Sequence, residues 1–185
     1  MYCLLKAHWV ACAAVTGAAL LLLSPLLYDV WPLGLLLIYL HSPGYMIHQV
    51  EEHAGDRFRS YVNQRLFGGR EALTTRGVLW VNVGAVWGVN LAALYVARWA
   101  GPAWALAAPY LMIVNAISHI ATALRFGGYN PGLLTSLLVF LPLGVGSLWR
   151  ISATGAQHAL GLAISLGLHA VIVRSVLAHL RQLRD

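Results

Sequence analysis

The sequence predicts an all-α protein, a polytopic transmembrane helix bundle of about six helices with both termini in the cytoplasm. Three observations lead to this fold class. Hydrophobic residues make up 59% of the chain and charged residues 10%, whereas soluble domains average about 45–50% and about 25%. Apolar runs recur along the whole sequence, each near the roughly 20 residues that a helix needs to cross a bilayer. The basic residues gather in alternate loops.

Six spans account for the apolar runs, and the whole chain, 1–185, is expected to form one integral membrane domain. The expected spans are 9–28, 31–53, 76–98, 102–124, 131–149 and 156–180. The first run follows Lys6, as the apolar part of a signal peptide would. Bulky Leu26, Leu27 and Tyr28 stand where a cleavage site needs small residues, so we interpret this run as a retained helix.

The segment 56–67, between the second and third spans, is expected to lie on the inner membrane surface as a short amphipathic helix. Phe58, Tyr61, Val62 and Leu66 recur at helical spacing, and arginines occupy the rest of the turn. An ordinary solvated loop is the alternative.

The basic residues predict the orientation. With a cytoplasmic N-terminus, every Lys and Arg except Arg98 and Arg150 falls on the inner side, which is the positive-inside pattern. We therefore expect a bacterial-type cytoplasmic (inner) membrane. The net charge of +6 is explained by this topology and by contact with membrane lipids, without a nucleic-acid partner.

The stretch YMIHQVEEHAGDRFRS, residues 45–60, carries the strongest functional pattern. Glu51 and Glu52 are two of only six acidic residues in the chain, and they stand between His48 and His53 at the end of an apolar run. On a helix, residues three and four positions after His48 flank its face. Both carboxylates are therefore predicted to lie beside His48, whereas His53 points away and is a weaker candidate.

The second span is interrupted by Ser42-Pro43-Gly44. Proline removes a backbone hydrogen bond, and a membrane helix tolerates this where the freed groups face protein or a wet cavity. A kink here suggests space for a ligand beside His41 and Tyr45. A kink that is simply packed by neighbouring helices is the alternative.

Polar residues also occur on later spans. Asn115, Ser118, His119 and Thr122 form one stripe on the fourth span, and in the predicted topology His119 reaches the depth of His48. Such a stripe also serves as hydrogen-bonding contact between helices. His169, at mid-membrane on the sixth span, is a candidate ligand, relay or packing residue.

The sequence Tyr129-Asn130-Pro131-Gly132 precedes the fifth span. Asn at the N-cap followed by Pro at the first helical position is a favourable helix start for local reasons. Asn130 is also a candidate for supporting the site.

Ionisable groups inside a bilayer are costly and mark function. Three explanations compete for this cluster. Iron or zinc bound by His48, Glu52 and His119, with Glu51 as a further ligand or general base, would make a metalloenzyme, and the paired carboxylates would also suit two ions. A metal-free isomerase or cyclase would use Glu51 or Glu52 as proton donor. A non-enzymatic protein would hold haem between membrane histidines or conduct protons or ions.

The motif HQVEE at 48–52, followed by Asn115-x-x-x-His119 and by Tyr129-Asn130-Pro131-Gly132, resembles the HXXEE family of small integral membrane proteins. The resemblance covers roughly residues 30–140 and implies that His48, Glu51 and Glu52 are signature positions. It implies no particular activity. More loosely, such a bundle is similar to the sterol isomerase and membrane terpene cyclase superfamily, with no residue to carry over.

We predict an integral membrane metalloenzyme with a catalytic centre of iron or zinc. It would act by oxidation or hydrolysis on a lipid, an isoprenoid or another apolar small molecule reached from the cytoplasmic leaflet. The expected metal ligands are His48, Glu51, Glu52 and His119. The residues expected to bind substrate or support the ligands are His41, Tyr45, His53, Asn115, Asn130 and His169.

Overall fold

The computed structural model describes residues 2–183, with side chains from residue 8 onward; the side chain of Lys6 and all of Arg184, both used for the orientation, lie outside the described residues. This part of the chain is helical and contains no strand, which confirms the predicted fold class. Its six long helices are α1 (Tyr2–Tyr28), α2 (Leu33–His53), the continuous helix formed by α4 (Thr75–Leu79), η3 (Trp80–Val86) and α5 (Trp87–Trp99), α6 (Ala107–Phe126), the continuous helix formed by α7 (Leu133–Thr135), η5 (Ser136–Phe140) and α8 (Leu141–Arg150), and α9 (Gly155–Gln182).

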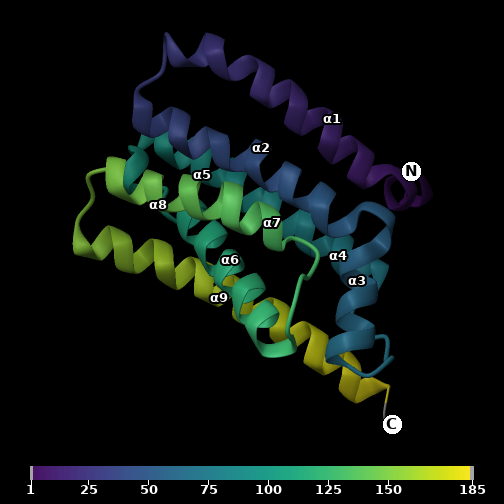
Figure 1. Ribbon diagram of the computed structural model, residues 1–185. Coiled ribbons are helices and arrows are strands. Elements are labelled where there is room, and N and C mark those ends of the chain that lie inside the picture. Colours follow the sequence, from purple (N-terminus) through teal and green to yellow (C-terminus); the bar gives the residue numbers. More distant parts are fainter. Residues whose placement is uncertain (1, 184–185) are drawn as a thin grey trace.

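The helices form a layered bundle with α2 inside it (Figure 1). Helix α1 packs along one side of α2, and α5, α6 and α8 also pack against α2. Helix α9 lies at the opposite edge against α6. The start of α1 and the end of α9 lie at the same end of the bundle, as an even number of crossings requires. Which end faces the cytoplasm stays a prediction from the basic residues.

Five helices within residues 2–183 are long and apolar enough to span a membrane. They are α1 (from His8), the helix 75–99, α6, the helix 133–150 and α9. Outer positions such as Leu22 and Val173 are 79% and 57% exposed, which suits contact with lipid rather than water. The protein is therefore an integral membrane protein by this criterion.

Helix α2 has the length of a span, 21 residues, but is not among the five apolar helices. Polar side chains lower the hydropathy of this helix. The buried ones include His41, His48, Gln49, Glu52 and His53. A helix that neighbouring helices enclose does not need to be apolar, since its polar groups can find partners in the protein. The least apolar long helix is thus the innermost one.

The segment that follows α2 forms the short helix α3 (Arg57–Tyr61), continued by η2 (Val62–Leu66). Its apolar side packs on the end of the bundle, where Phe58 and Val62 join a cluster with Trp9 and Val78. On its outer side Arg59 pairs with Asp56 and, at 3.1 Å, with Glu71. The predicted helix therefore forms, and its apolar side covers protein.

The space expected beside the Pro43 kink is filled at Gly44, although Tyr45, one residue further on, lines a cavity described below. Helix α2 continues through Pro43 to His53. A Cβ atom added at Gly44 would lie 2.8 Å from the Met112 side chain of α6 and 3.4 Å from Leu143 of α8. The glycine therefore allows neighbouring helices to approach closely, and the packing alternative is the correct one at this position.

Candidate functional site

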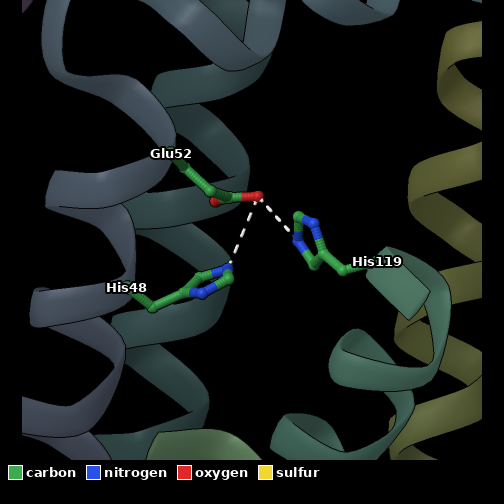
Figure 2. A group of neighbouring side chains, drawn as sticks. All are labelled: His48, Glu52 and His119. Atoms are coloured by element: carbon green, nitrogen blue, oxygen red, sulfur yellow. Dashed lines mark ion pairs between the residues drawn. The ribbon is translucent and has the colours of Figure 1, made fainter. Parts of the chain in front are cut away.

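His48 and Glu52 of α2 and His119 of α6 converge on one point inside the bundle (Figure 2). The Nε2 atoms of His48 and His119 lie 3.5 Å and 3.1 Å from the same carboxylate oxygen, Glu52 Oε1. One ligand atom from each residue lies within 4.8 Å of the others. All three side chains are buried, with at most 5% of each residue exposed. The helical spacing of His48 and Glu52, four residues apart, puts both on the face that meets α6.

Asn130 determines how the His119 ring is oriented. Its amide Nδ2 donates to the backbone oxygen of His119 at 2.9 Å, so its Oδ1 must face the ring. His119 Nδ1 lies 2.6 Å from Oδ1 and donates to it. In a neutral ring the other nitrogen, Nε2, then carries the lone pair, and this is the atom that faces Glu52.

Asn130 is therefore not the N-cap expected from the sequence. The helix begins at Leu133, and Gly132 occupies the cap position. The side chain of Asn130, which is only 1% exposed, is turned toward α6 instead of toward its own helix. The local pattern was a plausible helix start, but a tertiary contact uses the same side chain.

Thr135 orients the His48 ring, as Asn130 orients the His119 ring. His48 Nδ1 lies 2.7 Å from Thr135 Oγ1. The single hydroxyl hydrogen of Thr135 is donated to Glu51 Oε2. The hydroxyl oxygen must therefore accept from His48 Nδ1–H, so His48 Nε2 also carries a lone pair. That Nε2 atom has no hydrogen-bond partner among the described residues.

Glu51 lies outside the cluster, which corrects its expected role as metal ligand or general base. Its carboxylate accepts from the backbone N–H groups of Leu134 (3.1 Å) and Thr135 (2.7 Å), from the Thr135 hydroxyl and from the Tyr129 hydroxyl (2.8 Å). Partial burial, together with the hydrogen bond to Glu51 and its charge, raises the pKa of Tyr129 and keeps this phenol a donor. Glu51 thus caps the free N–H groups at the start of α7, as carboxylates at helix N-termini do.

Three lone-pair atoms therefore point at one buried position. If both rings are neutral, no hydrogen lies between His48 Nε2, His119 Nε2 and Glu52 Oε1. Acceptors facing one another in a low-dielectric interior repel unless a positive charge lies between them. The hydrogen bonds made by Asn130 and Thr135 thus prepare the site for a metal ion or for an added proton.

Gly132 allows the loop to reach this position. Its φ is +99°, in the region that favours glycine. A Cβ atom at Gly132 would lie 2.6 Å from His119 Cε1 and 2.8 Å from both Glu52 Cγ and His48 Cε1. A side chain at this one position would overlap all three members of the cluster, so no larger residue fits.

His53 also reaches the cluster, although the sequence analysis ranked it as a weaker candidate. Its Nε2 lies 3.1 Å from the second oxygen of Glu52, Oε2. Its φ and ψ of −111° and −6° depart from ideal α-helical values, because α2 ends there. The angle of 100° per residue therefore does not determine where this ring points.

Behind His53 lies a chain of buried hydrogen bonds. The Trp87 indole donates to Gln49 Oε1 at 2.8 Å, and Gln49 Nε2 donates to Asn82 Oδ1 at 3.1 Å. Asn82 Nδ2 donates to Val78 O and lies 3.2 Å from His53 Nε2. An indole N–H only donates, so it determines the direction of every bond in the chain. This chain explains a tryptophan deep inside a span.

Aromatic rings cover the remaining sides of the cluster. Phe140 lies with its ring centroid 4.2 Å from that of His48, and Phe58 lies 5.7 Å from that of His119. Phe140 is fully buried. These apolar rings lower the polarity on their sides of the cluster, which strengthens electrostatic interactions there.

The other candidates from the sequence fall into two groups. Tyr45, Asn115 and His169 line a cavity of about 330 Å³ that Glu52, His53, His119 and Asn130 also border. His41 does not line it. The His41 ring donates from Nδ1 to Leu37 O at 2.8 Å and is fully buried on α2, so its expected role in orienting ligands is not supported.

Three residues of the site had no role predicted from the sequence: Gln49, Gly132, which appeared only as part of the Tyr129–Gly132 motif, and Thr135. Gln49 stands inside HQVEE itself, and a buried amide on a membrane helix is a recognisable pattern. Gly132 and Thr135 carry no comparable pattern, because a glycine and a threonine near a helix start are ordinary. Only the fold shows their contacts.

Comparison with known proteins identifies one family. The family described as a protein of unknown function with HXXEE motif matches residues 39–147, which is more than half of the chain. The match contains every residue of the cluster and of its hydrogen-bond partners, whereas helices α1 and α9 lie outside it. No curated protein and no solved structure matches the chain significantly.

Proposed function

This chain belongs to the HXXEE family, and from the geometry of its signature residues we propose that it is an integral membrane metalloenzyme. The observation that carries the proposal is the convergence of three buried lone-pair atoms, His48 Nε2, Glu52 Oε1 and His119 Nε2. Two imidazoles and one carboxylate form the ligand set of open catalytic zinc sites and of non-haem iron sites. The ion would be iron or zinc.

The distances support a shared ion. Ligand atoms about 2.0–2.1 Å from one ion lie about 2.8–3.0 Å from one another in octahedral geometry and about 3.3–3.4 Å in tetrahedral geometry. Glu52 Oε1 lies 3.5 Å from His48 Nε2 and 3.1 Å from His119 Nε2, close to these values, and the three atoms all lie within 4.8 Å of one another. The Nδ1 atoms of His119 and His48 donate hydrogen bonds to Asn130 and Thr135. Hydrogen bonds of this kind orient the ligating histidines of metalloproteins. A single ion is favoured over two, because the oxygens of Glu51 already have four donors.

Three protein ligands leave positions for water or a substrate, and a bound ion would activate water or dioxygen there. His53 is the group that could accept a proton, since it contacts the free oxygen of Glu52 and borders the cavity. The cavity is lined mainly by apolar side chains, so a lipid, an isoprenoid or a similar molecule would be the substrate. The reaction would be an oxidation or a hydrolysis.

Two alternatives make different demands on the same residues. In a metal-free isomerase or cyclase, a proton would occupy the position of the ion, and Glu52 or an imidazole would transfer it to the substrate. Haem between His48 and His119 is disfavoured, because Gly132 lies against both rings and leaves no room for a porphyrin.

The proposal is tested by elemental analysis of the protein purified in mild detergent. We expect about one iron or zinc ion per chain, removed by a strong chelator, and a lower unfolding temperature after removal, because an ion that binds only the folded state stabilises it. His119→Ala should contain essentially no metal.

His158→Ala is the matched control, since His158 contacts Tyr110 on the outer part of the bundle and not the cluster. It should keep its metal. Wild-type protein that is folded and free of metal would refute the metalloenzyme and favour the acid–base alternative.

Removing the Thr135 hydroxyl should weaken metal binding without removing a ligand. Thr135→Val keeps the size of the side chain but leaves His48 Nδ1 without its acceptor. We expect a metal affinity about 10–100-fold lower, the usual effect of losing an outer hydrogen-bond partner. A competition titration with a chromophoric chelator measures it. Thr135→Ser, which keeps the hydroxyl, should bind nearly as tightly as wild type, and equal affinity in Thr135→Val would contradict the role of Thr135.

A further inference from the structure

Beside the cluster lies a cavity of about 330 Å³, bounded by α2, α6, α9, the helix 57–66 and the first half of the helix 75–99. Most of its lining is apolar, and this volume is at the lower end of small-molecule sites, which hold about 300–1,000 Å³. A whole phospholipid would not fit inside. A small head group followed by a chain or ring would fit.

Two polar atoms at this cavity have no partner. The hydroxyl of Tyr45 and Oδ1 of Asn115 are both buried and make no hydrogen bond within the described residues. Tyr45 is only 2% exposed, and both residues line the cavity. Buried polar groups are nearly always hydrogen-bonded, so these two atoms indicate a polar group of the occupant.

Their positions relate that group to the cluster. Tyr45 precedes His48 by three residues on α2, and Asn115 precedes His119 by four residues on α6. One helical turn rises about 5.4 Å. Tyr45 and Asn115 therefore lie about one turn from the proposed ion, on the same side of it.

The chemistry of the lining narrows the polar group. Tyr45 can donate and accept, whereas Asn115 Oδ1 only accepts, so one group that both donates and accepts satisfies the pair. A hydroxyl does this, whereas a carbonyl only accepts and would leave Asn115 Oδ1 without a donor. No Lys or Arg occurs among the described residues that line the cavity, and the Glu52 carboxylate borders it. Apart from the proposed ion, whose charge Glu52 already offsets in part, phosphate and carboxylate head groups therefore have no cationic partner.

The exposed apolar residues at the edge of the cavity come from α9 and from the helix 57–66. Val176 of α9 packs against the Val62 cluster of that helix, and the two segments lie side by side in Figure 1. Leu66, Val173 and Leu177 line the cavity while being 37%, 57% and 43% exposed. An apolar, exposed rim on a membrane-spanning bundle admits molecules from the bilayer rather than from water.

We propose that this cavity binds a neutral lipid alcohol, with its hydroxyl held between Tyr45 Oη and the Asn115 amide and its apolar body extending past α9 toward the bilayer. This inference rests on the proposed function, since it names the substrate class of the same site. It adds two specificity-determining residues that do not bind the ion.

Binding of radiolabelled dodecan-1-ol to the metal-loaded protein in lipid nanodiscs tests the proposal, with empty nanodiscs as reference. We expect saturable binding, and no saturable binding of dodecane or dodecanoic acid. Tyr45→Phe and Asn115→Leu should each weaken it about fivefold to tenfold, the effect of one lost hydrogen bond. Tyr95→Phe, which changes a half-exposed tyrosine on α5, should bind as wild type does.

Metal content is measured on the same samples to separate the two proposals. Metal retained in wild type and in both variants, with dodecane and dodecan-1-ol bound equally or with no effect of either substitution, would overturn the lipid-alcohol site while leaving the metal centre intact. Absence of metal from wild type refutes the proposed function itself, and the alcohol inference then falls with it.

Discussion

Gly132→Ala should empty the metal site and destabilise the protein by about 3 kcal/mol or more, since it combines backbone strain at positive φ with overpacking of a filled interior. The added methyl group would lie within 2.8 Å of atoms of His48, Glu52 and His119. None of these atoms is the far end of a flexible chain that can turn aside, so the loop or the ligands must move. A displacement of even a fraction of an ångström separates ligands that one ion must bridge. Elemental analysis and thermal unfolding in detergent measure the two effects.

The variant Gly128→Ala distinguishes the effect of backbone strain from the effect of steric overlap. Gly128 lies in the same loop with a comparable φ of +114°, but a Cβ atom there has no neighbour within 4 Å. This variant should lose only the stability that the strained backbone costs, about 1–2 kcal/mol, and should keep its metal. A Gly132→Ala protein that retains metal at the wild-type level would show that the loop does not press on the ligands as described.

Glu52→Gln should remove the metal and leave a folded protein. The substitution keeps the shape of the side chain and removes its charge. Its new amide hydrogens can donate to one of the two Nε2 lone pairs, so the metal-free bundle keeps a hydrogen bond at its centre. The loss in metal affinity should exceed the about 10–100-fold that an outer hydrogen-bond partner contributes. A chelator should then have no effect on the unfolding temperature of the variant.

The metal-free alternative predicts a different result for the same variant. If an imidazolium ion and the Glu52 carboxylate form a buried ion pair, Glu52→Gln leaves a charge uncompensated and should cost about 3–5 kcal/mol, whereas a chelator should leave wild type unchanged. Glu71→Gln serves as the control, because Glu71 is an exposed carboxylate that pairs with Arg59 outside the site. It should alter neither metal content nor, to any large extent, stability.

Helical periodicity predicted one half of the site and could not choose between neighbours. His48 and Glu52 share a face because they are four residues apart, and the structure agrees. Glu51 is only one residue away, and periodicity placed it beside His48 as well, as a further ligand or general base. That one residue turns its carboxylate toward α7, where backbone N–H groups occupy it. The periodicity of the α2 sequence does not specify which helix packs on each of its sides.

The residues that surround the cluster show where local rules give a wrong expectation. The local rule for helix starts predicted Asn130 as an N-cap. The chain does not adopt that conformation, although it is locally favourable. The contact with His119 joins residues 11 positions apart across a loop. His53 was ranked as a weaker candidate because of the rotation of 100° per residue. That angle holds only inside a helix, and α2 ends at His53. Local rules fail where a helix ends or where a tertiary hydrogen bond competes.

By itself the sequence determined that this chain forms membrane helices and that the second of them carries imidazoles and carboxylates at one end. Both follow from local properties, the free energy of transferring apolar side chains and the rise and turn of a helix. Only the tertiary structure decided that Glu52 rather than Glu51 meets His119, that Gly132 closes the site, and that Asn130 and Thr135 direct two lone pairs inward. Those facts depend on which surfaces of separate helices meet, and a hydrogen bond between distant residues has a direction only once both partners are in place.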